Sequence, residues 1–265
     1  MEDKPHVIER VAALLRAIGD HEPSGSSTSD LARYTHLARP TVHRMLTALA
    51  AEGFADRDNT TGLWTLGPEI YLLGASAADR YDITDSARDI LRALSRDTGE
   101  SAFLSARRGD ETVCVAAEEG SFPLRSHVLH PGIRFPLGVA SAGLVILAHL
   151  PDLEIDDYID RTDLTDRYGP AHAAEPIRER IESTRAQGYS VNPGLLVEGS
   201  WGMGAAVFDH RDAPAWALSL TGVETRFSAE RRPELGTVLL RAAHELTRRL
   251  RPAGPPRGRR GIPRA

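Results

Sequence analysis

Residues 36–49 read HLARPTVHRMLTAL. The apolar residues of this run fall at positions i, i+3, i+4 and i+7, the spacing of one helix face: Val42, Met45, Leu46 and Leu49. Pro40 suits the first turn of such a helix, because the backbone N–H that proline lacks has no partner there. The run therefore predicts a short amphipathic helix.

The opposite face of this predicted helix is polar and basic. It carries Pro40, His43, Arg44 and Thr47, with Arg39 and Thr41 at its N-terminal edge. No Asp or Glu occurs between Asp30 and Glu52. A helix with Arg, His and Thr outward and no acid nearby suits the major groove of DNA. A solvated amphipathic helix has the same pattern, so the neighbouring segments must separate the two interpretations.

Those segments predict a winged helix-turn-helix. Residues 5–18 have the pattern of a helix with one apolar face, and Ser27-Thr28-Ser29-Asp30 matches a capping box that starts a second helix near Ser29. A turn at 36–38 leads into the predicted recognition helix, which ends at Gly53. Residues 54–57 and 63–66 flank a turn at 58–62, which indicates a β-hairpin. Three helices followed by a hairpin make this fold, with the hairpin as the wing.

The run DLARYTHLARPTVHRMLTALAAEGFADRD, followed by LWTLGP, resembles the DNA-binding half of the IclR family of bacterial transcription regulators. That family has a "tGL" turn, a "stvhRlL.tL…G" recognition helix and a wing closing in "Y.LGp". The matching residues are Leu37, Thr41-Val42-His43-Arg44, Leu46, Leu49, Gly53 and Leu66-Gly67-Pro68. Trp64 replaces the aromatic Tyr, and His36 replaces the glycine of the turn. The candidate DNA contacts are Arg39, Pro40, Thr41, His43, Arg44, Thr47 and Arg57.

Length and charge set further bounds. A chain of 265 residues suggests two folded units. The net charge of −5 argues against a general electrostatic affinity for nucleic acid. Residues 1–67 hold seven Lys or Arg and nine Asp or Glu, so this region is also slightly acidic. Any charge that attracts DNA must therefore be local.

The single cysteine, Cys114, excludes an intramolecular disulfide and a cysteine-rich zinc site. No apolar run approaches membrane-spanning length, and no signal sequence opens the chain. We therefore expect a soluble, cytoplasmic protein without membrane partners.

Pro68 opens a predicted linker helix, residues 68–81, that is rich in apolar residues such as Ile70, Leu72 and Leu73. Such a helix either packs on its own wing or mediates dimer contacts. The second interpretation is favoured because winged-helix proteins usually pair to reach two half-sites. We expect a homo-oligomer, either a dimer or a tetramer.

The pattern after residue 82 predicts an α+β domain around a mostly antiparallel sheet. The expected helices are 84–98, 141–150, 153–159, 176–187 and 233–250, and the expected strands are 101–106, 112–117, 122–129, 189–191, 203–208 and 215–221. The region resembles the GAF-like effector domain of the IclR family through LRALSRDTGES, GIRFPL…SAGLVILA, RAQGYSVN and AAVFDHRDAPAWALSLTG. The expected domains are 1–67 for DNA, 68–81 as linker, 82–250 for the effector and 251–265 as a tail.

The tail is rich in Pro, Gly and Arg, and from Arg248 onward the chain has seven Arg and no acid. Such a composition predicts disorder, because little apolar surface is available for burial. Auxiliary contact with DNA phosphates is the alternative interpretation.

No catalytic or metal-binding pattern is found. His127 and His130 have no third ligand within the next few residues, and a structural or solvent-facing role is favoured for them. Cys114 lies between Val113 and Val115 of a predicted strand, as a small buried hydrophobe would. The chain has no G-x-S-x-G, Walker A or H-E-x-x-H motif. We expect no cofactor, no metal and no enzymatic activity.

The resemblance implies an effector site between the loop before the buried helix and the final strands. The candidate residues are Leu137, Gly138, Val139, Ala140, Ser141, Ala142, Met203, Ser219 and Thr221. The family's "PLHAS" becomes PLGVA, a common Lys becomes Leu144, a frequent Cys becomes Gly202 and a usual Asp becomes Asn192. These changes predict a cleft that is roomier and less polar than in family members reported to bind small oxo-acids, and that takes a small neutral or largely apolar metabolite. Ser219 and Thr221, on one face of a strand, either orient this ligand or satisfy nearby backbone groups.

Together these observations predict a sequence-specific transcription regulator that binds double-stranded operator DNA and senses a small molecule. The ligand shifts DNA affinity only as far as it binds one dimer arrangement better than another. Two alternatives stay open: a ligand-blind DNA-binding regulator, and an enzyme domain fused to a DNA-binding module. The loss of polar groups from the cleft keeps the first alternative, and the lack of a nucleophile or metal ligands counts against the second.

Overall fold

The computed structural model describes residues 6–78 and 83–250. The chain forms two compact units, Met1–Asp82 and Ile83–Ala265. The predicted basic tail, 251–265, and the end of the predicted linker, 79–82, lie outside the described residues. Within the described ranges no helix is long and apolar enough to cross a membrane.

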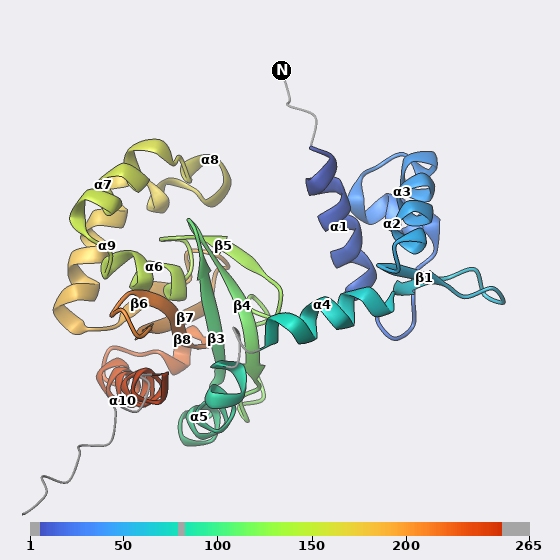
Figure 1. Cartoon of the computed structure of the whole chain (residues 1–265). Coiled ribbons are helices and arrows are strands. Elements are labelled where there is room, and N and C mark those ends of the chain that lie inside the picture. Colours follow the sequence, from blue (N-terminus) through green and yellow to red (C-terminus); the bar gives the residue numbers. More distant parts are fainter. Residues whose placement is uncertain (1–5, 79–82, 251–265) are drawn as a thin grey trace, which may run out of the picture. The chain divides into compact units, whose positions relative to one another are not determined.

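The first unit is a winged helix-turn-helix (Figure 1). Its elements are α1 (Val7–Gly19), α2 (Thr28–Thr35), α3 (Arg39–Ala51), β1 (Ala55–Arg57), β2 (Trp64–Leu66) and α4 (Pro68–Ala78). The Ser27 hydroxyl caps α2 by accepting a hydrogen bond from the Asp30 backbone N–H at 3.2 Å. The antiparallel pair β1–β2 forms the wing. The predicted three helices and hairpin are confirmed.

A small apolar core joins the elements of this unit. Its fully buried side chains come from three helices and the wing: Leu14, Ile18, Leu31, Val42, Leu46 and Trp64. The indole N–H of Trp64 donates to the Thr28 hydroxyl at 3.0 Å, so the ring also fixes the start of α2. The apolar stripe predicted from the sequence of α3 is thus the face that holds the helix in the domain.

The second unit is built on a six-stranded antiparallel sheet with the order β5-β4-β3-β8-β7-β6. The strands are β3 (Ser101–Arg108), β4 (Glu111–Glu118), β5 (Arg134–Pro136), β6 (Ser190–Pro193), β7 (Ser200–Phe208) and β8 (Pro214–Val223). The first and last long strands, β3 and β8, are paired at the centre. The α+β architecture with an antiparallel sheet is confirmed.

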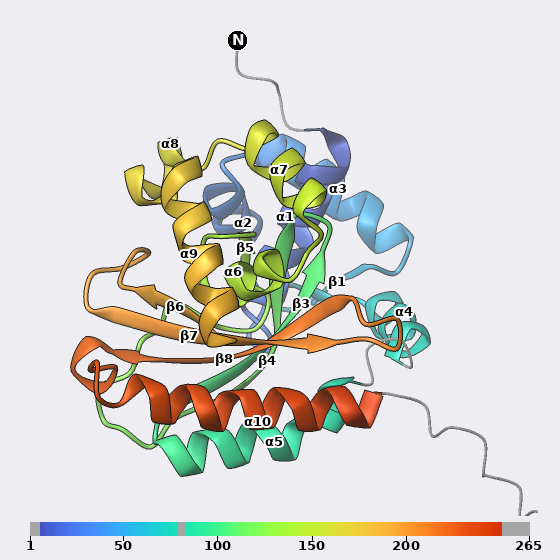
Figure 2. The ribbon, with the colours of Figure 1, turned by 90° about the vertical axis from the view of Figure 1, so that its left-hand side faces the viewer.

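Helices cover both faces of this sheet (Figure 2). On one face lie α5 (Ile83–Thr98) and α10 (Arg232–Leu250), which pack side by side. The other face carries α6 (Ser141–Ala148), α7 (Asp152–Arg161) and α9 (Ala174–Gln187), with the short α8 (Thr165–Tyr168) and 3-10 turn η2 (Pro170–His172) between the last two. A second 3-10 turn, η3 (Glu224–Arg226), precedes α10.

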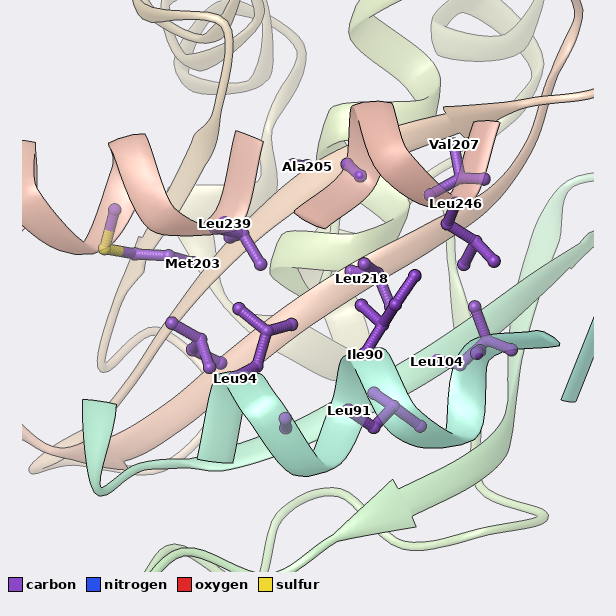
Figure 3. Packing of buried hydrophobic residues seen from close by; sticks show 14 of the residues in the cluster. Ile90, Leu91, Leu94, Leu104, Met203, Ala205, Val207, Leu218, Leu239 and Leu246 are labelled. Carbon is purple, nitrogen blue, oxygen red and sulfur yellow. The ribbon is translucent and has the colours of Figure 1, made fainter. Parts of the chain in front are cut away.

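The two faces bury separate apolar clusters. Under α5 and α10, alternate residues of β7 and β8 point toward the two helices: Met203, Ala205, Val207, Leu218 and Leu220 (Figure 3). The residues in between, such as Ala206 and Ala217, face α6. This alternation follows from the two-residue period of a strand. It assigns a face to every side chain of the two strands.

A buried carboxylate joins the start of β3 to the segment between β8 and α10. Glu100, at the start of β3, is almost fully buried, and its Oε1 accepts hydrogen bonds from Arg226 at 2.8 Å and Arg231 at 2.6 Å. Both arginines also donate to the backbone carbonyl of Thr98. The pair of cations compensates the cost of burying the carboxylate.

One predicted strand is wrong. Residues 122–129 form no strand, and the sheet edge is instead completed by β5 at 134–136. The side chain of Leu124 is exposed, so this segment lacks the buried alternate residues that a half-buried strand needs. Pro123 also removes one backbone donor. The segment covers the end of the sheet as a loop.

Candidate functional site

The outward face of α3 gathers most of the predicted DNA contacts. Val42 and Leu46 are fully buried and fix the helix, which turns the side chains of Arg39, Pro40, His43, Arg44 and Thr47 toward solvent. Thr41 is half-buried at the edge of this face. The helix rise brings residues four apart onto one stripe, so Arg39 and His43 are neighbours, as are Pro40 and Arg44. We call this face, residues 39, 40, 43, 44 and 47, the α3 outer face.

The α3 outer face is positively charged. Within the described part of the chain, neither Arg39 nor Arg44 forms an ion pair or a hydrogen bond with another side chain. The nearest acid before α3 in sequence, Asp30, is bonded to Ser27 and Arg33 at the start of α2. Both guanidinium groups are therefore available to phosphates or base edges.

The wing contributes one further cation. The guanidinium of Arg57 lies 5.6 Å from the centre of the Trp64 ring, and its Nε donates to the Gly62 carbonyl at 3.5 Å. The adjoining turn carries Asp58, whose carboxylate accepts the backbone N–H groups of Thr61 and Thr60 at 2.7 Å each. These bonds hold the pKa of the Asp58 carboxyl below its usual value, so the turn is anionic at neutral pH. Arg57 is thus an exposed cation on the wing, beside an anionic turn.

The predicted effector site lies where α6 meets β7 and β8. Gly204 of β7 faces α6 so closely that an added Cβ would lie 2.8 Å from the carbonyl oxygen of Ser141. The Ser190 hydroxyl donates to the same carbonyl at 2.7 Å. Gly202, two residues along the strand, faces the Ser141 hydroxyl. The two glycines therefore let the first turn of α6 approach the sheet.

Two buried hydroxyl groups face this contact. Ser219 and Thr221 of β8 pair in register with Gly204 and Gly202, so their side chains point to the α6 side of the sheet. Both are buried, and neither hydroxyl has a hydrogen-bond partner among the described residues. The first turn of α6 has no side-chain cap. Two unpartnered hydroxyls and an uncapped helix start therefore lie on the same side of the sheet, and such groups can hydrogen-bond an oxygen-bearing ligand.

The cavity at this point is small. It has a volume of about 20 Å³, and it is lined by Val128, Leu129, Ala140, Ser141, Asn192, Leu196, Ser200, Trp201, Gly202 and Thr221. A space of this size holds roughly one water molecule. The first turn of α6 fills the space that the glycines leave free, and no charged side chain lines the cavity. A cleft roomier and less polar than in family members that bind small oxo-acids stays a prediction.

Asn192 ties together two segments around the cavity. Its amide Nδ2 donates to the Val139 carbonyl at 2.7 Å, and its Oδ1 accepts the backbone N–H of Leu195 at 3.0 Å. An aspartate at this position has no N–H to donate. The asparagine therefore joins the loop before α6 to the turn after β6, and its amide is largely occupied within the protein.

The structure separates the predicted effector residues. Ala140, Ser141 and Thr221 line the cavity, whereas Ser219, two residues before Thr221 on β8, points to the same side of the sheet without lining the cavity. Met203 is on the opposite face of the sheet, packed with α5 and α10 (Figure 3), so its assignment to the pocket is wrong. The remaining predicted residues do not line the cavity: Leu137, Gly138, Val139 and Ala142. The side chains of Leu137, Val139 and Ala142 belong to the apolar cluster around α6, and Gly138 packs against Leu147 and Ile177.

Several cavity residues were not predicted from the sequence. Val128 and Leu129 come from the loop 121–133, Leu196 from the segment between β6 and β7, and Ser200 and Trp201 from the start of β7. Ser200 and Ser126 share a hydrogen bond of 2.6 Å between these two segments. Because residues 122–129 were predicted to form a strand, Val128 and Leu129 were not recognised as cavity residues. Loop residues separated by about 70 positions give no periodic signal of their proximity.

The reactive groups of the domain do not form a catalytic centre in the described residues. Burial raises the pKa of the Cys114 thiol to about 12, so the sulfur is protonated at neutral pH. No three His, Cys, Asp or Glu side chains come together as a metal site in the part of the chain that the structure describes.

Comparison with known proteins agrees with this arrangement. The family model described as "IclR helix-turn-helix domain" matches residues 7–59, and "Bacterial transcriptional regulator IclR C-terminal" matches residues 75–248. The HTH-type transcriptional regulator KipR of Bacillus subtilis is 31% identical over 94% of this chain and 99% of its own length. These matches extend over both compact units.

Two solved structures share the fold. A crystal structure of the Thermotoga maritima IclR has a TM-score of 0.71 at 25% identity, and the match covers 92% of this chain and 98% of that one. An IclR homolog from Microbacterium hydrocarbonoxydans complexed with 4-hydroxybenzoate has a TM-score of 0.72 at 20% identity, over 91% of this chain and 97% of that one. The second match supports the fold alone.

A helix-turn-helix domain followed by a ligand-binding domain defines a DNA-binding transcription regulator. This chain belongs to the IclR family of bacterial transcription regulators. The family that the sequence resembles is thereby confirmed, and the observed sheet is compatible with the GAF-like description of the second domain.

The contact between Gly204 and Ser141 leads to a stability prediction. We expect Gly204→Ala to lower the free energy of unfolding by about 1–3 kcal/mol, because the new methyl group meets a backbone carbonyl rather than a flexible side chain. Urea denaturation measures the change. Gly74→Ala is the control, since no atom lies within 4 Å of its added Cβ and alanine favours a helix. An unaltered stability of Gly204→Ala would contradict the close contact.

Proposed function

We propose that this regulator contacts operator DNA through the α3 outer face, with Thr41 at its edge and Arg57 from the wing. The single observation that supports this assignment best is the pair of exposed arginines, Arg39 and Arg44, on a helix face without an acid. The buried opposite face supports it further, because a rigid helix is needed to place side chains on base edges.

We propose a division of labour along the chain: residues 1–67 bind DNA, 68–81 link, 82–250 bind a ligand, and 251–265 form a basic tail. The ligand acts by linkage, since it changes DNA affinity to the extent that it binds one arrangement of the protein better than another. The protein is proposed to act in the cytoplasm, where bacterial DNA lies. The proposed function includes no enzymatic step.

The ligand proposed for the second domain is a small neutral or largely apolar metabolite that carries a hydroxyl or carbonyl oxygen. The uncharged cavity lining supports this class, because an anion without a cationic partner is costly to bury. The free hydroxyls of Ser219 and Thr221 and the uncapped start of α6 support the oxygen. Since the cavity holds about 20 Å³, the segments around it must move for such a ligand to enter.

A ligand-blind regulator is the second candidate function. The small cavity favours it, whereas the two unpartnered hydroxyls favour a ligand. Calorimetric titration with a metabolite panel separates the two candidate functions.

The first test concerns DNA. We expect Arg44→Ala to weaken binding to the DNA upstream of the protein's own gene by about 1–3 kcal/mol if Arg44 contacts a base. Fluorescence anisotropy with the full chain measures the affinity. Leu46→Ala is the matched variant on the buried face and should instead lower stability by roughly 2–5 kcal/mol. Equal affinity of wild type, Arg39→Ala and Arg44→Ala would refute the assignment.

The second test concerns the ligand. We expect calorimetric titration of the full chain with a metabolite panel to find a neutral binder, and the variant Ser219→Ala/Thr221→Val to bind it at least tenfold more weakly, roughly the loss expected for two hydrogen bonds. Thr237→Val, on the exposed side of α10, is the control and should bind normally. Tight binding of an oxo-acid anion would contradict the low-polarity argument. If nothing binds, the ligand-blind regulator is the better description.

The third test concerns assembly. We propose at least a dimer that uses α4, because Tyr71, Leu72 and Leu73 are 77%, 55% and 51% exposed on one short helix. Light scattering should give a multiple of the chain mass of 28.8 kDa, and Leu72→Glu/Leu73→Glu should reduce the mass. Leu124→Glu, which changes a leucine that is 65% exposed in the loop 121–133, should leave the mass unchanged. A wild-type mass near 28.8 kDa at micromolar concentration would remove the proposal.

A further inference from the structure

The turn between α2 and α3 contains a strained residue. His36 has φ 54° and ψ 28°, in the left-handed region. A residue with a Cβ pays free energy for this conformation, whereas glycine adopts it freely. In the described residues the one other non-glycine residue with positive φ is Asp212, in the turn between β7 and β8. The turn would therefore be more stable with glycine at position 36.

Contacts within the protein do not explain the histidine. The side chain of His36 is exposed, and its ring has no hydrogen bond, ion pair or ring contact in the described part of the chain. His21 of the same unit differs, since its ring bonds to the Ala17 carbonyl and contacts the Tyr34 ring in a tilted arrangement at 4.8 Å between centroids. The backbone strain at His36 is thus not offset by a side-chain contact in the described residues. Strained backbone conformations of this kind cluster at functional sites.

The position of His36 indicates which partner its ring meets. It lies three residues before Arg39, at the entrance to α3, and the exposed polar side chains that follow are those of the α3 outer face. No acid occurs in sequence between Asp30 and Glu52, and Asp30 sits at the far end of α2, bonded to Ser27 and Arg33. An imidazole N–H is a hydrogen-bond donor, and phosphate oxygens beside the groove accept such bonds.

We propose that the imidazole of His36 donates a hydrogen bond to a DNA backbone phosphate next to the bases faced by α3. This inference rests on the proposed DNA contact of α3 and adds a contact from the turn. A phosphate contact is independent of sequence, so it strengthens binding to operator and non-operator DNA alike.

The test compares two substitutions that both remove the ring but differ in the backbone strain that they leave in the turn. His36→Gly removes the ring and relieves the strain, whereas His36→Ala removes the ring and keeps the strain. We expect both full-length variants to bind roughly three- to tenfold more weakly, the range for one lost hydrogen bond. The probes are the duplex upstream of the gene and a duplex of arbitrary sequence and equal length. His36→Gly should nevertheless melt at the same or a higher temperature than wild type.

Asp212→Gly is the matched control, because it changes the other left-handed residue and lies in the other compact unit. Its DNA affinity should equal that of wild type. The phosphate contact is refuted if His36→Gly binds both duplexes as tightly as wild type, if only one of the two His36 variants is weakened, or if the loss is confined to one duplex. Equal binding by wild type, Arg39→Ala and Arg44→Ala would instead refute the α3 contact itself, so the two failures are distinguishable.

Discussion

The second domain depends on the seating of α6 against the two glycines of β7. All eight residues of α6 are buried, so the helix must be covered by the sheet on one side and by other helices on the other. Gly202 and Gly204 let its first turn reach the strand, and Ser190 fixes the Ser141 carbonyl there. The same contact leaves a cavity of only about 20 Å³, lined by Thr221. If a ligand binds at this proposed site, it has to disturb the contact that completes the core, and its binding energy would in this way affect the rest of the domain.

The first domain lacks an overall positive charge that would attract DNA. Its residues carry slightly more acid than base, and the wing turn holds the ionised Asp58. In the proposed DNA contact, attraction therefore comes from a short acid-free stretch around α3, because the domain has no general positive potential. Such a distribution limits binding to DNA of arbitrary sequence, where charge supplies most of the affinity. Discrimination then depends on a few well-placed side chains, which makes the rigidity of α3 on Val42 and Leu46 essential.

Local signals explain why the first domain was predicted well and the ligand site less well. The capping serine, the apolar stripe of α3 and the hairpin turn each lie within a few residues, and the structure has all three. In β7, glycines occupy the positions that face α6, so hydropathy gave no indication of which face Met203 takes. The bond from Asn192 to Val139 joins residues 53 positions apart, and the loop 121–133 has no period. Contacts of this kind are set by the folded topology and leave no pattern in the sequence.

The pairing of β3 with β8 has a consequence for co-translational folding. Ser101 of β3 pairs with Thr221 of β8, and Glu100 finds its arginines only at residues 226 and 231. On the ribosome, the helix-turn-helix domain emerges complete while the central strand of the other domain still lacks one neighbour. Until β8 is synthesised, one edge of β3 stays open to foreign strands, and the carboxylate of Glu100 is without its cations. The nascent chain can thus fold its helix-turn-helix domain before the second domain is complete.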